Sequence, residues 1–435
     1  MIIDEMDEAV AYIENLVRFT EKHSNEHTRE CLLRLGEPDR SFLTIHVAGT
    51  NGKGSVCAFL ASFLEEDGVR TGLFTSPHLV RIEERIKVDE RNIDEEDFLF
   101  AFWRVKDVAL EMEREGKGHP SYFEFLYLMA MVHFQREHVS VAVIETGLGG
   151  RLDATNSLLS PMITVITAIG MDHMQYLGHT IEEIAGEKAG IMKAGVPCVY
   201  ADDNPAASAV LVQHAHEMGV PITGLHPGDY EILSQGDGCI DFRTSFRYDG
   251  SDTFSIHAWA PYQVENASLA LLAARTIGEK NHFWRRVLSA ETVKKGLLSM
   301  EWPGRMEEVE PGVFLDGAHN DNGIVRFAEA VRGIEGERHA LLVFAVVNDK
   351  DYRDMIRDLL KGIFWDAIYV TEVRGSRKTD RAKIAALFRE AGAEGVTEVE
   401  DEERAYEMAM ADRNGRDLFV CGSLYLIGAI KERRK

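Results

Sequence analysis

The sequence predicts an α/β protein built around a mainly parallel sheet, followed by a second, smaller α/β domain. Short β-branched runs of strand length alternate with longer amphipathic stretches of helix length, which is typical of α/β folds. The strand-length runs are apolar throughout, which indicates a parallel sheet that helices cover on both faces. A length of 435 residues suggests two or three domains.

The N-terminal part of the chain supplies the elements of the larger domain. We expect strands at residues 43–47, 69–74, 139–144 and 163–169, and helices at 55–66, 95–114, 122–137 and 265–279. Residues 228–258 differ because polar and apolar side chains alternate there, which predicts a small β-hairpin. A further helical stretch follows Ala290.

A Pro-Gly pair marks the expected domain boundary. The sequence WPGR at 302–305 lies between helical sequence and a new strand, which is typical of a linker. After it the alternation starts again, with strands expected at 313–315, 340–347, 367–371 and 418–420. We therefore expect a first domain over residues 1–301, a linker at 302–306 and a second domain over 307–435.

The composition excludes several classes of partner. The chain has 48 basic and 72 acidic residues, and its net charge of -24 repels nucleic acid and anionic membranes. Its first residues, MIIDEMDEAV, do not resemble a secretory signal, and its apolar runs are far shorter than the roughly 18 residues of a membrane helix. The five cysteines lack a CxxC spacing, which predicts reduced thiols and a cytoplasmic location. Any anionic ligand therefore needs a locally built binding site.

The strongest local motif is HVAGTNGKGS at residues 46–55, between a predicted strand and a predicted helix. Its glycines let backbone N–H groups turn towards a phosphate, the helix N-terminus adds a positive dipole, and Lys53 adds a charge. The motif departs from GxxxxGK[ST], which requires glycine at Val47 and Ser or Thr at Gly54. A nucleotide-binding loop and a glycine-rich turn without a ligand both remain open. The candidate ATP contacts are Gly52, Lys53, Gly54 and Ser55, and the Ser55 hydroxyl is also a candidate magnesium ligand.

Further motifs follow in a fixed order. They are TSPHL at 75–79, ETGLGGRLDATN at 145–156, MDHMQYLG at 171–178, GEKAGIMK at 186–193, WPGRME at 302–307, LDGAHN at 315–320 and GSLY at 422–425. Together with GTNGKGS, they resemble the folylpolyglutamate synthase and dihydrofolate synthase family of Mur-ligase-like, ATP-dependent amide ligases. The resemblance covers nearly the whole chain. It implies an N-terminal ATPase domain of the phosphate-loop type, a smaller C-terminal Rossmann-like domain and an active site between them.

The resemblance also implies two magnesium sites. Ser76, Glu145 and His173 match the family's magnesium ligands. Without the resemblance, Glu145 follows an apolar strand at the edge where ligands gather, and it could equally be a solvated acid. His173 by itself is more typical of a structural histidine. Because the chain is so acidic, we expect ATP to bind poorly without magnesium.

Lys188 and Lys193 lie on a predicted helix, where most lysines are simply solvated. Lys188 matches the family lysine that carbon dioxide carboxylates, so the resemblance implies an N6-carboxylysine at this position. A carbamate turns a cation into an anionic oxygen ligand. It requires a deprotonated amine, which burial or a nearby cation favours.

Asn266, Arg305 and Asp316 match the family's remaining ATP contacts. Arg305 lies in the linker, where its guanidinium would reach the phosphates only when the domains approach, so we expect domain closure to gate the reaction. For His319, substrate binding and packing both remain open. Ser423 is a further candidate for binding glutamate.

One motif departs from the family pattern. Members commonly have Gly-x-His-Gln before the asparagine that matches Asn266, whereas this chain has Ala260, Pro261, Tyr262 and Gln263. The conformation of this segment is therefore open.

The activity implied by the resemblance is ATP-dependent ligation of L-glutamate to a folate or dihydropteroate carboxylate through an acyl phosphate. Catalysis would rest on positioning and electrostatics, with Lys53, Glu145, His173 and Lys188 as catalytic residues. The GGRLDATN stretch resembles the bifunctional bacterial enzymes, so we expect both activities, with a monofunctional folylpolyglutamate synthase as the alternative. The substrate-binding candidates are Ser121, Leu152, Asp153, Ala154 and His319.

Two other functions remain open. A cell-wall Mur ligase shares the chemistry but places a nucleotide-sugar domain before the phosphate loop, and the segment ahead of Lys53 is too short for one. A nucleotide-binding regulator would need only the loop and would leave Glu145, His173 and Lys188 without a role. We expect a cytoplasmic monomer that binds ATP, magnesium and small-molecule substrates, and that binds neither nucleic acid nor membranes.

Overall fold

A computed structural model describes residues 2–17, 25–248, 250–335, 339–347, 352–373 and 379–434 of the chain. It contains two compact units. Unit 1 comprises Met1–Glu231, Phe242–Ser255 and Glu265–Met300, and unit 2 comprises Ile232–Asp241, Ile256–Val264 and Glu301–Lys435.

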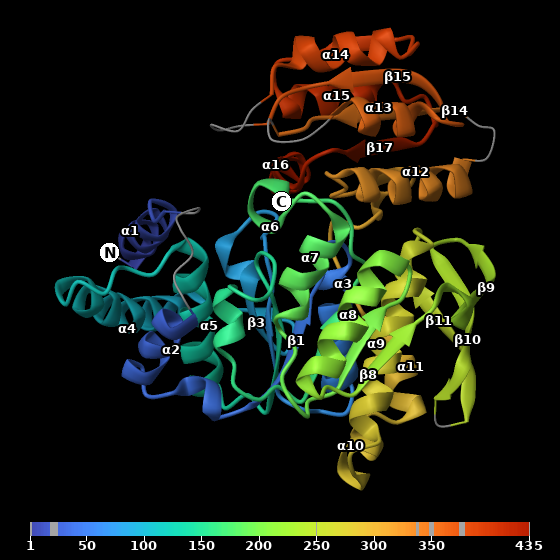
Figure 1. Cartoon of the computed structure of the whole chain (residues 1–435). Coiled ribbons are helices and arrows are strands. Elements are labelled where there is room, and N and C mark those ends of the chain that lie inside the picture. The colour runs from blue at the N-terminus through green and yellow to red at the C-terminus, as the bar shows by residue number, and fades with distance from the viewer. Residues whose placement is uncertain are drawn as a thin grey trace. The chain divides into compact units, whose positions relative to one another are not determined.

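Unit 1 is organised around an eight-stranded sheet with the order β4-β3-β2-β5-β1-β6-β7-β8 (Figure 1). Its strands are β1 Leu43–Ala48, β2 Thr71–Phe74, β3 Ile86–Val88, β4 Arg91–Asn92, β5 Val141–Glu145, β6 Ile163–Ile166, β7 Cys198–Ala201 and β8 Ile222–Leu225. The strands from β2 to β8 in this order pair in parallel, and β3 and β4 pair antiparallel at the edge. The predicted parallel sheet is confirmed. The sequence pattern did not predict β3, β4, β7 and β8, each of which has four residues or fewer.

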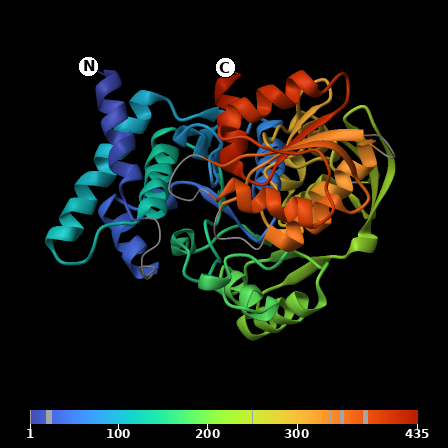
Figure 2. The same cartoon turned by 90° about the horizontal axis from the view of Figure 1, so that it is seen from above.

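The helices that accompany this sheet are α1 Ile2–Glu14, α2 Asn25–Arg34, α3 Lys53–Glu65, α4 Glu95–Arg114, α5 Tyr122–Arg136, α6 Met174–Leu177, α7 Ile181–Ala189, α8 Pro205–Met218, α9 Tyr262–Gly278, α10 His282–Val287 and α11 Ala290–Ser299. Several of them cover the sheet, and others pack on those helices. The strand register places Ala48, Ile144 and Ile166 on one face, where α4 and α5 enclose one core and α7 and α8 enclose another. Figure 2 shows α1, α4 and α5 together beside the sheet. α3 and α11 pack on each other, and Ser62 Oγ donates to Gly296 O at 3.0 Å.

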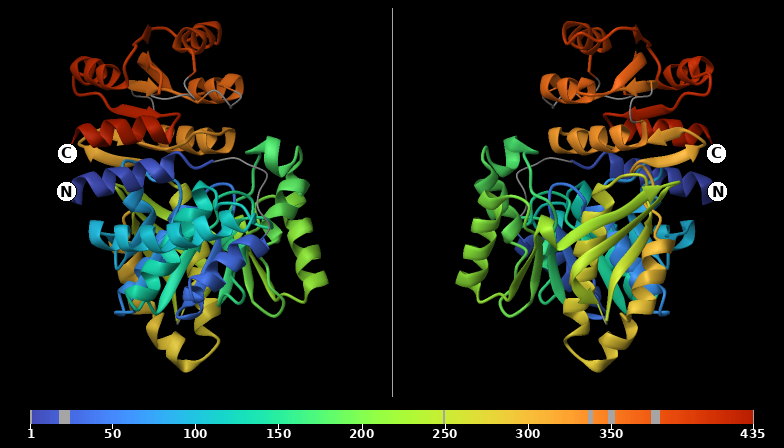
Figure 3. Two further views of the ribbon diagram at one scale, coloured as in Figure 1. Left: turned by 90° about the vertical axis from the view of Figure 1, so that its left-hand side faces the viewer. Right: turned by 90° about the vertical axis from the view of Figure 1, so that its right-hand side faces the viewer.

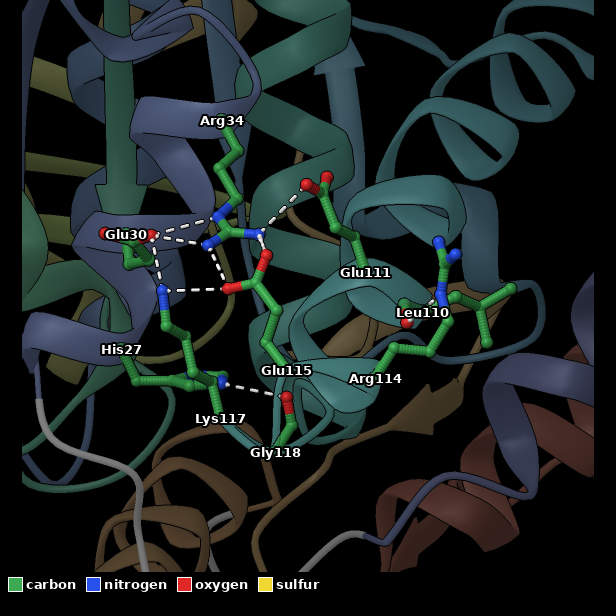
Figure 4. A network of polar contacts seen from close by, with 9 residues as sticks. All are labelled: His27, Glu30, Arg34, Leu110, Glu111, Arg114, Glu115, Lys117 and Gly118. Atoms are coloured by element: carbon green, nitrogen blue, oxygen red, sulfur yellow. Dashed lines mark hydrogen bonds and ion pairs between the residues drawn. The ribbon is translucent and has the colours of Figure 1, made fainter.

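A surface network of ion pairs ties α2 to the end of α4 (Figure 4). Arg34 of α2 contacts Glu30 at 2.9 Å and Glu115, just beyond α4, at 2.7 Å. Lys117 contacts the same two carboxylates at 3.2 and 3.0 Å. Hydrogen bonds from Arg34 lower the pKa of Glu30 and of Glu115, because they favour the ionised carboxylates.

The hairpin predicted between residues 228 and 258 is a sheet of three strands, seen side by side in the right-hand panel of Figure 3. The strands are β9 Tyr230–Gly236, β10 Cys239–Tyr248 and β11 Ser251–His257, in the order β11-β10-β9. β9 carries mostly exposed side chains and therefore lacks the alternation that marks β10.

Unit 2 contains a six-stranded sheet with the order β12-β13-β17-β14-β15-β16. Its strands are β12 Glu307–Glu310, β13 Val313–Leu315, β14 His339–Phe344, β15 Phe364–Val370, β16 Val396–Glu398 and β17 Leu418–Cys421, and its helices are α12 Asp321–Glu335, α13 Tyr352–Leu360, α14 Arg381–Glu390, α15 Glu402–Asp412 and α16 Leu424–Arg433. β12 pairs antiparallel and the other strands pair in parallel, so the predicted α/β structure of the C-terminal part is confirmed. Across the described residues, no helix has the length and apolarity needed to cross a membrane.

The compact units differ from the predicted boundaries around β11. Trp259 and Ala260 lie in the predicted first domain but belong to unit 2. The Trp259 ring packs edge-on against Phe314 with centroids 5.2 Å apart, and Ala260 is fully buried in the same core. This packing joins segments far apart in sequence, so the local pattern does not reveal it.

Candidate active site

Four loops of unit 1 follow β1, β2, β5 and β6, which are neighbours in the sheet and run in parallel. Parallel strands end at the same edge, so these loops gather at the carboxyl edge of the sheet. β2 and β5 lie on one side of β1 and β6 lies on the other, which makes β1 the topological switch point where open α/β sheets bind ligands. The glycine-rich loop at 49–52 follows β1 and is the centre of the candidate site.

The glycine-rich loop is held against the segment that follows β6. Gly49 has a φ of 151°, and a Cβ atom on it would lie 1.8 Å from Thr167 Oγ1. Thr167 donates to Asn51 O at 2.7 Å, and Thr50 N donates to Ala168 O at 2.9 Å. These contacts hold the loop against the segment that follows β6.

Gly52 ends the loop in the left-handed region, with a φ of 88°, and α3 begins at the next residue, Lys53. A Cβ atom on Gly52 would lie 2.3 Å from Asn266 Oδ1 of α9, so the predicted contact residue Asn266 packs against this glycine. The first N–H groups of α3 then point from the loop, which suits an anion.

Lys53, Glu145 and Ser76 meet beside this loop. Lys53 Nζ lies 3.8 Å from Glu145 Oε1 and donates to Thr50 O at 3.3 Å. Glu145 ends β5 and is 3% exposed, and its Oε2 accepts from Ser76 N at 3.0 Å. Ser55, in the first turn of α3, is buried as well. The structure therefore brings together predicted residues from three separate segments.

Lys188 is a buried lysine that contacts the glycine-rich loop. It lies in the last turn of α7, is 2% exposed and donates from Nζ to Gly49 O at 2.7 Å. The helical pattern did not indicate this position, and only the family resemblance pointed to it.

His173 differs from these residues because it is exposed. It precedes α6 in the left-handed region with a φ of 49°, and its backbone N–H donates to Asp172 Oδ1 at 2.8 Å. No group of three or more His, Cys, Asp and Glu side chains suited to a metal ion occurs in the described part of the chain. The predicted ligand set contains only two such residues, Glu145 and His173, beside two serines.

The predicted substrate-binding residues of unit 1 have different environments. Leu152 is 38% exposed, whereas Asp153 and Ala154 are buried. Ser121 is the N-cap of α5, where its backbone N–H donates to Glu124 Oε2 at 2.7 Å in a reciprocal capping box.

In unit 2, the predicted residue Asp316 is the centre of a buried cluster of hydrogen bonds. It follows β13, is 2% exposed and accepts from Tyr262 Oη at 2.7 Å, Met306 N at 2.8 Å and Ala318 N at 2.7 Å. Burial raises the pKa of Asp316, and the nearby Arg305 guanidinium opposes that rise. Tyr262 is the residue that stands in place of the family histidine, and it supports Asp316.

The other predicted residues of unit 2 have local partners. Arg305 Nη1 donates to Gly304 O at 3.1 Å, and a Cβ atom on Gly317 would lie 2.3 Å from it. His319 Nδ1 forms a hydrogen bond with Gly317 O at 2.7 Å. Ser423 caps α16.

The chain matches the Mur ligase middle domain over residues 47–274 and the Mur ligase, glutamate ligase domain over residues 304–424. It is 34% identical over 438 residues to the dihydrofolate synthase/folylpolyglutamate synthase of Bacillus subtilis, covering 98% of this chain and 99% of that protein. The chain belongs to the folylpolyglutamate and dihydrofolate synthase family.

Other members are similar to this synthase over the same span. The folylpolyglutamate synthase of Lacticaseibacillus casei is 31% identical over 444 residues, covering 98% of this chain and 97% of that protein. The Mycobacterium tuberculosis folylpolyglutamate synthase complexed with ADP superposes with a TM-score of 0.87 at 28% identity, covering 100% of this chain and 99% of that one. E. coli FolC in complex with DHPP and ADP gives a TM-score of 0.84 at 27% identity, covering 99% and 98%. This synthase is therefore an ATP-dependent ligase of the Mur ligase type.

The sequence motifs of this synthase do not reveal residues that act through a neighbour. Thr167 holds the glycine-rich loop, and Tyr262 donates to Asp316. Thr167 belongs to no motif, and Tyr262 stands out only as a departure from the family pattern, without a role. For Thr167 one signal was available, because a polar residue directly after a buried strand is a typical ligand-edge residue.

Proposed function

We propose that this synthase ligates L-glutamate both to dihydropteroate and to a reduced folate, using ATP. The observation that carries the proposal is the phosphate loop, where Lys188 contacts Gly49 and Lys53 pairs with Glu145. Two similarities support the choice of substrates. The Bacillus subtilis relative is named for both activities, and E. coli FolC has been solved with DHPP and ADP.

A free carboxylate must be activated before an amine can attack it. In the proposed first step, a carboxylate oxygen of the pteroate or folate attacks the γ-phosphorus of ATP, and the bond to ADP breaks to leave an acyl phosphate. The deprotonated amine of glutamate then attacks the acyl carbon, the bond to phosphate breaks, and the amine loses its remaining extra proton to solvent. Lys53 and the N–H groups at the start of α3 stabilise negative charge on the transferred phosphoryl group.

The oxygen donors near the phosphate loop fit magnesium. Glu145 is a buried carboxylate whose Oε1 lies 3.8 Å from Lys53 Nζ, and Ser55 and Ser76 carry hydroxyl oxygens. We assign Ser55, Ser76, Glu145 and His173 as the residues that would hold magnesium, which when bound neutralises phosphate oxygens.

We further assign Lys188 as an N6-carboxylysine. Its side chain is buried and its amine contacts the phosphate loop, whereas an ordinary lysine keeps its amine in water. The amine nitrogen adds to the carbon of carbon dioxide and releases a proton, which gives an anionic carbamate. With ¹³C-bicarbonate, we expect a carbamate signal by NMR in the native synthase and none in Lys188→Ala. A native protein without that signal at saturating bicarbonate would refute the assignment.

A glutamate-dependent assay tests the main proposal. Purified synthase, ATP and glutamate are incubated with dihydropteroate or with tetrahydrofolate, and both the glutamylated product and phosphate are measured. We expect both substrates to be glutamylated, with one phosphate released for each bond formed. Product from tetrahydrofolate alone would establish a monofunctional folylpolyglutamate synthase instead.

The same assay separates the remaining alternatives. Phosphate release that is indifferent to folate and to glutamate would contradict the ligase proposal and favour a nucleotide-binding regulator. Ligation of a different amino acid to a nucleotide-sugar substrate would favour a cell-wall Mur ligase.

We propose that the synthase acts as a cytoplasmic monomer. All five cysteines are free, and four of them are buried, which agrees with a reducing compartment. Light scattering of the purified protein tests the oligomeric state, and a mass of two or more chains would contradict it.

A further inference from the structure

A fully buried histidine lies in the strand that leads into the phosphate loop. His46 belongs to β1, three residues before Gly49, and its side chain has no exposed surface. Its Nε2 atom lies 2.8 Å from Thr155 Oγ1. Thr155 is also fully buried and belongs to the 3₁₀ helix η3, Ala154–Ser157, directly after the predicted substrate-binding loop. The functions assigned so far leave this pair without a role.

The direction of these hydrogen bonds follows from the proton count. Thr155 Oγ1 lies 2.6 Å from Asp153 Oδ1, and an ionised carboxylate only accepts, so the single hydroxyl proton goes to Asp153. Thr155 Oγ1 must therefore accept from His46, which carries its proton on Nε2. His46 Nδ1 is buried without a partner among the described residues, and a bare lone pair there costs less than an orphaned N–H group.

The His46 imidazole does not titrate in the physiological range. Burial, with a smaller contribution from the charge of Lys193, lowers the pKa of His46 to about 3, so the imidazole stays neutral. The donor on Nε2 is consequently present at any working pH.

Asp153 connects Thr155 to the loop at 147–154 by hydrogen bonds. Its Oδ2 accepts from Gly147 N at 2.9 Å and from Leu148 N at 2.8 Å, and its Oδ1 also accepts from Thr155 N at 3.1 Å. With the Thr155 hydroxyl, four protein donors occupy a carboxylate that is 3% exposed. The carboxylate is therefore committed to holding the loop, and Leu152, at 38% exposed, remains available to a ligand.

We propose that His46 and Thr155 are positioning residues that hold Asp153, and through it the loop at 147–154, in the shape that binds the pteroate part of the substrate. The inference rests on the proposed function for the identity of the ligand. It also assigns Asp153 to positioning, in place of the direct substrate contact expected from the resemblance. His46 belongs to β1, the strand that leads into the phosphate loop. Through His46, this strand would therefore support both the ATP-binding loop and the loop at 147–154.

The test compares variants that keep or remove one hydrogen bond. Thr155→Val removes the hydroxyl at nearly constant shape, whereas Thr155→Ser retains it. His46→Leu removes the donor, whereas His46→Gln places an amide N–H near the former Nε2. Thr71→Val removes the hydroxyl of a buried threonine in β2, which donates to Val69 O at 2.8 Å, and is the control for stability alone.

We expect Thr155→Val and His46→Leu to raise the KM for dihydropteroate about ten-fold and to leave the KM for ATP within about two-fold, because only the folate side loses its preformed loop. Thr155→Ser and His46→Gln should recover most of the loss. The double variant should cost less than the sum of the single ones, since removing both partners leaves no orphaned group. Hydrogen–deuterium exchange should rise in peptides covering 146–156 and stay unchanged in those covering 46–55.

Two results would overturn the inference. One is an equal change in the KM values for dihydropteroate and for ATP. If that change reflected lost stability, the control Thr71→Val would show it too. The other is unchanged exchange at 146–156 in Thr155→Val. A wild-type protein that ligates no folate, but whose loop still loosens in Thr155→Val, would refute the proposed function and uphold the positioning role.

Discussion

At the scale of single residues, the site depends on polar groups removed from water and paired inside the protein. Glu145 and Lys188 are each at most 3% exposed, and each contacts the phosphate-loop region. The sequence motif identified Lys53 and its loop because glycine spacing reflects a backbone requirement. The motif did not identify the residues that contact Lys53 and the loop, because those residues belong to other strands and helices.

Replacement of Lys53 should remove catalysis without unfolding the protein. We expect Lys53→Met to lower kcat/KM on the order of 100-fold or more, because the proposed role of Lys53 is to stabilise negative charge on the transferred phosphoryl group. The melting temperature should change little, since Lys53 is partly exposed and its pair with Glu145 is long, at 3.8 Å. Steady-state kinetics and thermal unfolding measure the two effects, with Lys295→Met on α11 as the matched control. Retained activity in Lys53→Met would contradict the assigned role.

Glu65, the last residue of α3, makes the stability of unit 1 depend on pH. Burial, with smaller contributions from the charges of Glu90 and Asp89, raises the pKa of Glu65 to about 7. The folded state therefore binds a proton that the unfolded state releases near pH 4.5, so stability falls as pH rises from about 4.5 to about 7.

Glu65→Gln should remove this loss of stability at high pH. We expect the variant to be more stable than the native protein by about 1 kcal/mol at pH 8, after allowance for the partial exposure of Glu65, and by nothing at pH 4. Urea unfolding at the two pH values measures the difference, and the exposed Glu14→Gln serves as control. Equal stabilisation at both pH values would show that ionisation is not the cause.

At the scale of elements, apolar strands and long amphipathic helices were predictable, whereas most short or exposed elements were not. β1, β5 and β6 are almost wholly buried and appeared as apolar runs. β9 is an exposed edge strand, and β3 and β4 have three and two residues, so none of them produces a clear period. Their existence depends on pairing with a neighbouring strand.

The ion-pair network between α2 and α4 should be sensitive to salt. Arg34 contacts Glu30 and Glu115 on the surface, where ions screen the attraction. We expect Arg34→Ala to lower the melting temperature more at about 20 mM than at about 500 mM NaCl. Differential scanning calorimetry at the two concentrations provides the measurement. A salt-independent loss would mean that packing of the arginine stem, and not its charge, holds the helices.

At the scale of the whole molecule, a net charge of -24 opposes the binding of ATP. The phosphate loop offers Lys53 and the α3 N-terminus, but Glu145 lies 3.8 Å from that lysine, and a carbamate on Lys188 would add a further negative charge. The site as proposed is therefore balanced only when a divalent cation accompanies the nucleotide.

Removal of magnesium should consequently weaken ATP far more than adenosine. We expect EDTA to raise the Kd of ATP by about ten-fold or more, and to leave that of adenosine unchanged, because only the phosphates need the cation. Isothermal titration calorimetry with both ligands measures this. If EDTA leaves ATP affinity unchanged, the protein groups alone balance the phosphate charge.

The sequence by itself determined the α/β class, the main buried strands, the phosphate loop and the family, because each of these is written in a local period or a motif. Tertiary structure decided which residues hold the site. Thr167 clamps the loop, Lys188 reaches Gly49, and His46 reaches Thr155, 109 positions further along the chain. Such contacts depend on strand order and burial, which place distant segments at one sheet edge, and no local spacing encodes them.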